Sequence, residues 1–440
     1  MSPTRPQSWL ESGGHRHWLL GEAARLIDFF KPACQDPEGG FFELGSDGRP
    51  QPIPAKEVVV TARMVHCFSL AHLLGHPGAG VLADHGLAFL ESAHRDPEHG
   101  GYWWTVDHSR PVDTTKRAYG HAHVLLGASS ALLAGRPGAE TTFAAVTRAI
   151  DEHFWSERDG LSVEEYQTDW SQLASYRGQN SNMHLAEALL VAHEASGERI
   201  HLERARSIAT RLIGEQARTH AWRIPEHYDA RWHVDPEYNR DDPEHVYRPY
   251  GTTPGHSLEW ARLLLQLVGL LGHDDGWMVD AARRLFARAV EDAWPARGGL
   301  FYTVGLDGRP LNRDRYWWVM AEALGAASYL TRVTGEPAYE RRYREFWDWV
   351  DAHLIDREHG AWRFVLDDEL QPKGRPWTGK HDLYHLLHAC LLPLLPVGRG
   401  PAAALRAGAL STDGDTLSTG DGALSSDGDT LSTGDGALER

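Results

Sequence analysis

DPEHGGYWW, at residues 96–104, is the stretch that decides the fold, because related segments recur along the whole chain. Each has a glycine or alanine followed by aromatic or apolar residues, usually just after an acidic turn. The other copies are DPEGGFFEL at 36–44, ERDGLSVEEY at 157–166, THAWRIPEHY at 219–228, ARGGLFYTV at 296–304 and DREHGAWRF at 356–364. Their spacing of about 60 residues, with one longer gap before the fifth copy, indicates a repeated supersecondary unit. The six copies predict six units.

Two stretches with helical periodicity separate consecutive copies. Examples are residues 122–133 and 143–154, and then 185–195 and 202–213. Each unit is therefore predicted to be a helical hairpin whose apolar face only its neighbours can cover. We expect an all-α fold, an (α/α)6 barrel of six helical hairpins. The turns Asp47-Gly48 and Asp307-Gly308 predict short β-hairpins at one rim, and we expect the site among the loops there.

The end of the chain has a different composition. STDGDTLSTGDGAL at 411–424 is followed by the near duplicate SSDGDTLSTGDGAL at 425–438. These segments have too little apolar material to fold alone, and the nonapeptide pattern of calcium-binding β-rolls is absent. We predict a catalytic barrel domain over residues 1–400 and an acidic, disordered low-complexity tail over residues 401–440.

Charge and cysteine content exclude several classes of partner. The chain has 440 residues and a net charge of −17 with histidine neutral, which would repel nucleic acid and anionic membranes. No export signal or membrane span is evident. Cys34, Cys67 and Cys390 form no disulfide or metal-binding pattern. We expect a cytoplasmic monomer or homo-oligomer that binds a neutral small molecule, with no nucleic acid or membrane partner.

A long segment lacks helical periodicity. Residues 227–256 are rich in proline, aspartate, tyrosine and histidine. Loops of this length inside a compact domain are usually functional, although a plain surface insertion is the alternative. We expect this loop to contribute to the site.

The aromatic and histidine content favours a carbohydrate ligand. The chain has 17 tryptophans and 26 histidines, and sugars stack on flat rings while polar groups bind their hydroxyls. In TPGHSLEW, at 253–260, Pro254 suits the start of a helix. His256 and Glu259 then share a helical face, where the carboxylate can orient the imidazole as part of a general acid/base pair.

Two further segments carry candidate site residues. In GKHDLYHLLH, at 379–388, His381, His385 and His388 are predicted to share one helical face. This face suggests zinc, but one helix supplies only part of a ligand set, and no glutamate occupies the metalloprotease position. In NSNMH, Asn180 and His184 begin another helix together with Asn182. Each histidine, taken singly, also fits a buried structural imidazole.

These residues resemble the N-acylglucosamine 2-epimerase superfamily, and within it the bacterial aldose–ketose isomerases acting on mannose or sulfoquinovose. The resemblance covers nearly all of residues 8–400. It is carried, in order, by TARMVH at 61, DHGLAFL at 84, KRAYGH at 116, NSNMH at 180, TPGHSLEW at 253, WVMAEALG at 318 and GKHDLYHLLH at 379.

The resemblance implies an (α/α)6 barrel without cofactor or metal, in which His256 and His385 transfer protons. It implies that Glu259 supports His256 and that Arg63 holds a cis-enediolate. The matching sugar-binding positions are Tyr119, Asn180, His184, Trp318 and Trp377, with His381 near the pocket. The implied reaction converts D-mannose to D-fructose, and D-lyxose to D-xylulose is a further candidate.

Other functions remain open on the same residues. A 2-epimerase on mannose, glucose or an N-acylglucosamine would use the two histidines as opposed bases. Sulfoquinovose isomerases differ at His381 and Val59, where they carry glutamine and tryptophan, so a neutral hexose is favoured. An inverting glycoside hydrolase needs two facing carboxylates, for which Glu259 has only Asp382 as a candidate partner. A noncatalytic sugar-binding protein would need no paired imidazoles.

Overall fold

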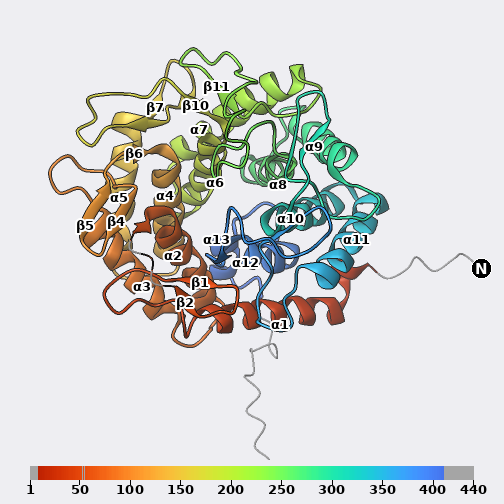
Figure 1. Cartoon of the computed structure of the whole chain (residues 1–440), viewed down its shortest axis with the longest axis horizontal. Coiled ribbons are helices and arrows are strands. Elements are labelled where there is room, and N and C mark those ends of the chain that lie inside the picture. Colours follow the sequence, from red (N-terminus) through yellow and green to blue (C-terminus); the bar gives the residue numbers. More distant parts are fainter. Residues whose placement is uncertain (1–7, 52, 54, 411–440) are drawn as a thin grey trace, which may run out of the picture.

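Two concentric layers of helices form a closed ring in the computed structural model, which describes residues 8–51, 53 and 55–410 (Figure 1). The inner helices are α2 (Val58–Leu73), α4 (Ala118–Leu133), α6 (Gln179–Ser196), α8 (Pro254–Leu271), α10 (Trp317–Thr334) and α12 (Tyr384–Leu391). The outer helices are α1 (Gly13–Phe30), α3 (Ala79–Phe89), α5 (Ala139–Ala149), α7 (Arg199–Ala209), α9 (Met278–Ala293) and α11 (Pro337–His353). The predicted (α/α)6 barrel is confirmed.

The ring closes by joining the two ends of the helical array. Each inner helix packs against the next, and α12 contacts both α2 and the first helix, α1. Five hairpins therefore join consecutive helices, whereas the sixth pairs α1 with α12. Segments η2 (Leu90–His94), η3 (Ile150–Phe154) and η4 (Thr210–Ala217) extend α3, α5 and α7, and the short helices η1 (Trp9–Glu11), η5 (Leu392–Leu394) and α13 (Pro401–Arg406) complete the set.

The burial pattern of each layer follows from its sequence. Helix α2 is buried continuously from Val58 to Ala71, as expected of a helix covered on all sides. Helix α9 buries one stripe, which includes Ala281, Leu285 and Phe286, and leaves its charged face in solvent. This difference places the inner layer in the core and the outer layer at the surface.

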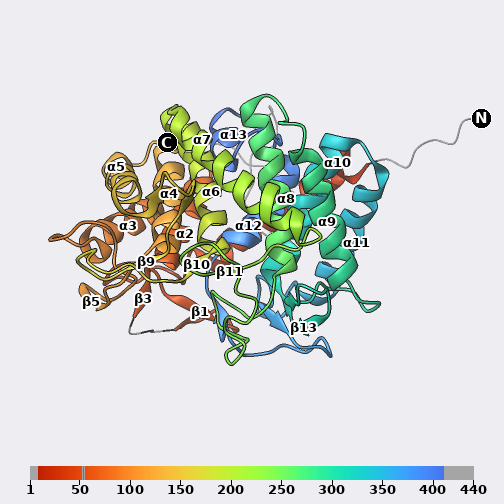
Figure 2. The same ribbon diagram turned by 90° about the horizontal axis from the view of Figure 1, so that it is seen from above.

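Short antiparallel strands line one rim of the ring, and α13 lies toward the other end (Figure 2). The strands are β1 (Glu43–Gly45), β2 (Pro50–Gln51), β3 (Lys56–Glu57), β4 (Thr105–Asp107), β5 (Arg110–Asp113), β6 (Lys116–Arg117), β7 (Trp155–Ser156), β8 (Leu161–Ser162), β9 (Glu165–Tyr166), β10 (Arg177–Gly178), β11 (His227–Tyr228), β12 (Thr303–Val304), β13 (Pro310–Asn312), β14 (Arg315–Tyr316), β15 (Val365–Leu366) and β16 (Gly379–Lys380). Hairpins β1–β2 and β12–β13 enclose the predicted Asp-Gly turns.

These strands also join neighbouring units around the rim. We call each of the six repeated copies a marker segment. The strand that precedes an inner helix pairs with a strand in, or directly after, the next marker segment around the ring, in the pairs β3–β4, β6–β9, β10–β11, β14–β15 and β16–β1. Where α8 begins, a single bridge between Thr252 and Val304 takes the place of a strand pair. The rim therefore fixes where each inner helix begins.

In three marker segments, the first residue is an aspartate that forms a buried ion pair with a lysine, and these pairs anchor the rim. Asp96 Oδ2 accepts a hydrogen bond from Lys116 Nζ at 2.7 Å, and the Lys116 side chain has no exposed surface. The other two pairs are Asp36–Lys56 and Asp356–Lys380. The aspartate that begins these three copies of the repeat therefore has a structural role that its recurrence alone did not reveal.

The glycines that follow in the marker segment allow close packing. Gly101 has a φ of +69°, which side chains disfavour. A Cβ atom there would lie 2.7 Å from the Trp170 ring and 2.9 Å from the His121 ring. Glycine is therefore required at this turn on both conformational and steric grounds.

The barrel extends beyond its predicted end. Helix α13 packs against α2, α4 and α6 and buries Pro401, Ala402, Ala404 and Leu405. The predicted boundary after residue 400 is therefore wrong, because these apolar side chains complete the core. The predicted disorder of the tail falls, for residues 411–440, outside the described residues. Among the described residues, none of the helices combines the length and the hydropathy of a membrane-spanning segment.

Candidate active site

One cavity at the strand-bearing rim gathers the predicted site residues from all six inner helices. It is lined by Arg63, Tyr119, Asn180, His184, Val246, Tyr247, Pro249, His256, Glu259, Tyr302, Trp317, Trp318, Trp377 and His385. Of the site positions implied by the resemblance, all except His381 line it, whereas the further candidates Asn182 and His388 do not. Their individual chemical roles remain predictions.

His256 and His385 face the same tryptophan within this cavity. The ring centroid of Trp318 lies 5.1 Å from that of His256 and 5.7 Å from that of His385. Two imidazoles far apart in sequence therefore flank one aromatic ring, which gives a small ligand access to both.

The carboxylate that holds His256 is Glu226, and the predicted pairing with Glu259 is wrong. His256 Nδ1 lies 2.9 Å from Glu226 Oε1. Although Glu259 is on the same helix, it lies near Arg262, at 3.5 Å, and His184, at 3.8 Å, instead. Donation from Nδ1 to Glu226 leaves Nε2, across the ring, as the nitrogen that can accept a proton.

A buried network fixes Glu226 in turn. Glu226 accepts hydrogen bonds from Gln179 Nε2 at 2.9 Å and from the Thr253 amide at 3.1 Å. Gln179 is itself held by Trp260, whose indole N–H donates to its Oε1. Burial would raise the pKa of Glu226, but His256, His227 and Gln179 together outweigh burial and lower this pKa. Glu226 is therefore a carboxylate at neutral pH.

His385 has an equivalent support that the sequence analysis did not single out. Its Nδ1 lies 2.9 Å from Glu322 Oε1, a carboxylate on α10 with no exposed surface. Burial lowers the pKa of His385, and Glu322 opposes this effect only in part. His385 is therefore a neutral imidazole near pH 7, which is the form of a general base. The sequence did contain a signal for Glu322. This residue follows Trp318 by four positions, and residues four apart share a helical face.

Arg63 lies between the cavity and two buried partners. Nη1 donates to Asp382 at 3.0 Å, and Nη2 donates to the Tyr119 hydroxyl at 3.0 Å. Burial raises the pKa of Tyr119 to about 12. Because Asp382 is engaged with Arg63, it is not free to act as the second acid of a glycoside hydrolase. The fixed guanidinium can instead stabilise an anion in the cavity.

Three carboxyl groups surround one guanidinium beneath the cavity. Arg262 contacts Glu187 and Glu322 at 3.0 Å but Glu259 at 3.5 Å. Burial raises the pKa of Glu259, and repulsion from Glu322 and Glu187 adds to this effect. One positive charge cannot offset three negative ones, so Glu259 is the member that keeps its proton. A neutral Glu259 can donate a hydrogen bond into the cavity.

His184, Glu187 and Glu259 are the described residues whose ligand atoms could converge on a metal ion. Arg262 already contacts both carboxyl groups of this set, so a cation there would face its charge. Burial lowers the pKa of His184 to about 4. These facts favour a role for His184 as a neutral hydrogen-bonding group rather than a metal ligand. That the reaction needs no metal remains a prediction.

The predicted three-histidine helical face is wrong. Helix α12 begins at Tyr384, so His381 precedes it. The His381 Nδ1 atom contacts Glu43, and its ring lies 4.4 Å from that of Trp377, so it supports a cavity wall. His388 points instead to His66, with 2.9 Å between their Nε2 atoms.

The long loop contributes to the site as expected. Val246, Tyr247 and Pro249 line the cavity, which connects the loop to residues of the inner helices. Asn180 Nδ2 donates to the Tyr247 carbonyl at 3.1 Å. Asn182, beside it in sequence, binds the backbone of Ser162 instead and has a structural role.

Comparisons with known proteins agree with the resemblance noted in the sequence. The family model described as N-acylglucosamine 2-epimerase (GlcNAc 2-epimerase) matches residues 39–389. D-mannose isomerase from Thermobifida fusca is 44% identical over 410 residues, covering 92% of this chain and 99% of that protein. Cellobiose 2-epimerase from Bacteroides fragilis is 24% identical over 366 residues, covering 78% of this chain and 88% of that protein.

The structural comparison points in the same direction. A crystal structure of D-mannose isomerase matches with a TM-score of 0.81 at 33% sequence identity. The match covers 89% of this chain and 99% of the other. The similarity therefore extends over both layers of the barrel.

Proposed function

The chain belongs to the N-acylglucosamine 2-epimerase family, and on this premise we propose that it is an aldose–ketose isomerase interconverting D-mannose and D-fructose. The observation that carries the proposal is the pair of imidazoles in one cavity, each bonded at Nδ1 to its own buried carboxylate. D-lyxose and D-xylulose, which have the same configuration around the reacting carbons, form a second substrate pair.

Ring opening is the first step of the proposed mechanism. His256 Nε2 takes the proton of the anomeric hydroxyl, and the imidazolium delivers this proton to the ring oxygen as the bond from C1 to that oxygen breaks, giving the open-chain aldehyde. Glu226 stabilises the imidazolium that forms. The mixed set of aromatic and polar groups in the cavity is suited to holding the extended sugar.

Proton transfer between C2 and C1 follows. His385 removes the C2 proton, and the electrons move to the aldehyde oxygen as a cis-enediolate. Arg63 stabilises the negative oxygen, and neutral Glu259 is suited to donate a hydrogen bond to it. The proton of the O2 hydroxyl passes to the neighbouring O1 of the enediolate, and His385 then returns the abstracted proton to C1 on the same face, so that O2 becomes the ketone oxygen of the ketose. The chemistry requires no cofactor or metal.

A sugar 2-epimerase is the alternative, favoured by the more distant likeness to cellobiose 2-epimerase. It would return the proton to the opposite face of C2. The higher identity to D-mannose isomerase, 44% against 24%, supports isomerisation. We further place the enzyme in the cytoplasm, which suits its three unpaired, buried cysteines.

Incubation with D-mannose in heavy water after chelator treatment tests the proposal. The expected product is D-fructose carrying deuterium at C1, followed by NMR. D-glucose with deuterium at C2 would instead identify an epimerase. Loss of activity with chelator and its return with added metal would refute the metal-free mechanism. A His385→Asn variant should lose exchange at C2.

A further inference from the structure

Tyr247 separates the candidate active site from a second cavity. Tyr119, Asn180 and Tyr247 line both spaces. The first cavity has a volume of about 50 Å³, whereas the second has about 180 Å³. His256 and His385 line only the smaller space, and Tyr247 is part of the wall that the two spaces share.

Several contacts hold this ring in place. Its centroid lies 5.2 Å from that of Tyr119, 5.3 Å from that of Trp104 and 6.3 Å from that of Trp377. Its hydroxyl donates to Glu57, and its carbonyl accepts a hydrogen bond from Asn180. Tyr247 is therefore a fixed wall rather than a loosely placed side chain.

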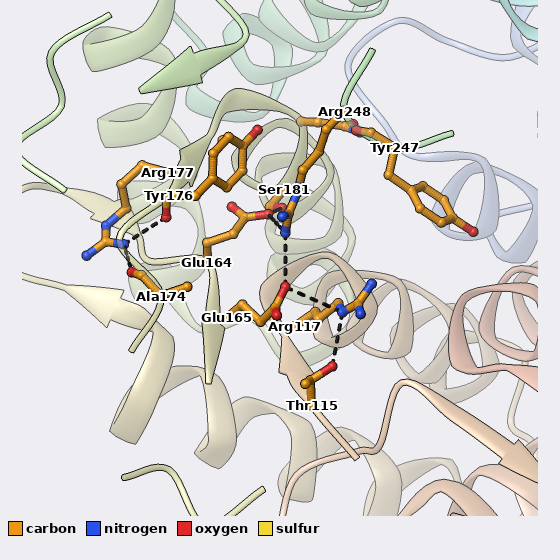
Figure 3. Close-up of polar contacts among 12 residues, drawn as sticks. Thr115, Arg117, Glu164, Glu165, Ala174, Tyr176, Arg177, Ser181, Tyr247 and Arg248 are labelled. Carbon is orange, nitrogen blue, oxygen red and sulfur yellow. Dashed lines mark hydrogen bonds and ion pairs between the residues drawn. The ribbon is translucent and has the colours of Figure 1, made fainter. Parts of the chain in front are cut away.

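Arg248 anchors the same segment from the opposite side. Figure 3 shows its guanidinium turned away from the Tyr247 ring and toward Glu165, at 3.1 Å. It also lies 3.5 Å from Glu164 and 4.3 Å from the centre of the Tyr176 ring. This network ties the loop to the rim of the barrel.

The second cavity has the chemistry of a polyhydroxyl site. Two arginines, Arg117 and Arg248, are matched by Glu164 and Glu165, so neither an anion nor a cation is favoured. Glu164 is 3% exposed, and its Oε2 atom makes no hydrogen bond within the described residues. Asn180 Oδ1 is likewise unpaired there. Such groups bind sugar hydroxyls well.

We propose that Tyr247 is a specificity-determining residue that limits the enzyme to free monosaccharides by closing off a space suited to a second sugar ring. This proposal rests on the isomerase function proposed above. With the ring removed, we expect the two cavities to join through the wall they share and to admit a disaccharide with mannose at its reducing end.

The test compares wild type, Tyr247→Ala and Tyr247→Phe on D-mannose and on mannobioses linked through O3, O4 or O6 of the reducing unit. Linkage through O2 is excluded because O2 becomes the ketone oxygen. Tyr250→Ala is the matched control, since Tyr250 lies in the same loop but lines a different cavity. Tyr247→Ser replaces Tyr247→Ala if the latter does not fold.

For wild type, kcat/KM on mannose should exceed kcat/KM on each mannobiose by about 100-fold or more. In Tyr247→Ala, this ratio of mannose to mannobiose should be about 10-fold smaller for at least one linkage. Tyr247→Phe and Tyr250→Ala should keep the wild-type ratio. Wild-type activity on mannobiose equal to that on mannose would overturn the proposal, as would a folded Tyr247→Ala with an unchanged ratio for every linkage.

A calorimetric titration separates this proposal from the proposed function. Mannobiitol, the reduced disaccharide, cannot isomerise, so its binding does not depend on catalysis. Binding to Tyr247→Ala but not to wild type supports the partition even if neither protein converts mannose. Equal binding to both, or binding to neither, contradicts it.

Discussion

His256 Nδ1 lies 2.9 Å from Oε1 of Glu226, a residue thirty positions earlier in the chain. His385 has the same relationship with Glu322. In both cases a buried carboxylate fixes the tautomer of the imidazole and stabilises its protonated form. Both proposed bases are thus oriented before substrate binds.

Replacing Glu226 by glutamine should lower kcat by about 100-fold with little change in KM, because a carboxamide cannot stabilise the imidazolium of His256. Steady-state kinetics on D-mannose measure both parameters. Glu237→Gln, an exposed carboxylate in the same loop, should keep the wild-type values. A rise in KM with unchanged kcat would show that Glu226 only binds substrate.

The pairing of His256 with Glu226 shows what helical periodicity could and could not predict. Periodicity relates residues three or four positions apart, and it led to Glu259. Glu226 reaches His256 because β10 pairs with β11, with Gly178 opposite His227. Such a register depends on contacts between units, which the local pattern of one helix does not contain.

The repeat nevertheless held a signal for Glu226. The carbonyls of Trp104, Glu164, Glu226 and Phe364, in four marker segments, each accept a hydrogen bond from the first residue of an inner helix. An alignment of the markers would have placed Glu226 at the start of α6. The ring, its six units and most cavity residues were predictable, whereas the carboxylate partners required the three-dimensional arrangement.

Replacing Glu322 by glutamine should change the pH dependence of the reaction. Burial lowers the pKa of His385 and Glu322 raises it, so removing the carboxylate lowers that pKa further. The acid limb of the kcat/KM profile, which reports the free enzyme, should move to lower pH, while the plateau falls by about 100-fold because the base is weaker. Profiles between pH 4.5 and 8 measure both effects. An acid limb that stays in place or moves upward would refute the assigned coupling.

Glu259→Gln should become more stable relative to wild type as the pH rises. The folded pKa of Glu259 is raised by burial and by its acidic neighbours, so its contribution to stability is present below pH 4.3 and is lost as the pH rises. Glutamine does not titrate, so the difference should grow by about 1.4 kcal/mol per pH unit until Glu259 ionises in the folded state. Urea denaturation at pH 5 and pH 8 measures it.

Glu187→Gln provides a control of opposite sign. Burial opposes ionisation of Glu187, but Arg262, His184 and His388 together outweigh burial and lower the pKa of Glu187. The stability from Glu187 is present above its unfolded pKa and is lost as the pH falls, so this variant should be least stable relative to wild type at pH 8. If both variants lost stability at pH 8, Glu259 would be ionised in the folded protein.

Replacing Asp96 by alanine should destabilise the barrel by about 3–5 kcal/mol, because it leaves the Lys116 ammonium buried without its partner. Asp280→Ala, which removes an exposed helical ion pair with Arg284, should cost less than about 1 kcal/mol.

The defect of Asp96→Ala should also depend on pH. Burial lowers the pKa of Lys116 and Asp96 raises it, so removing Asp96 lowers the pKa of Lys116 further. The defect should therefore shrink as the pH rises and the amine loses its charge. Adding Lys116→Met should recover part of the loss, and urea denaturation measures each step. A defect as small as that of Asp280→Ala would show that the marker ion pair does not anchor the rim.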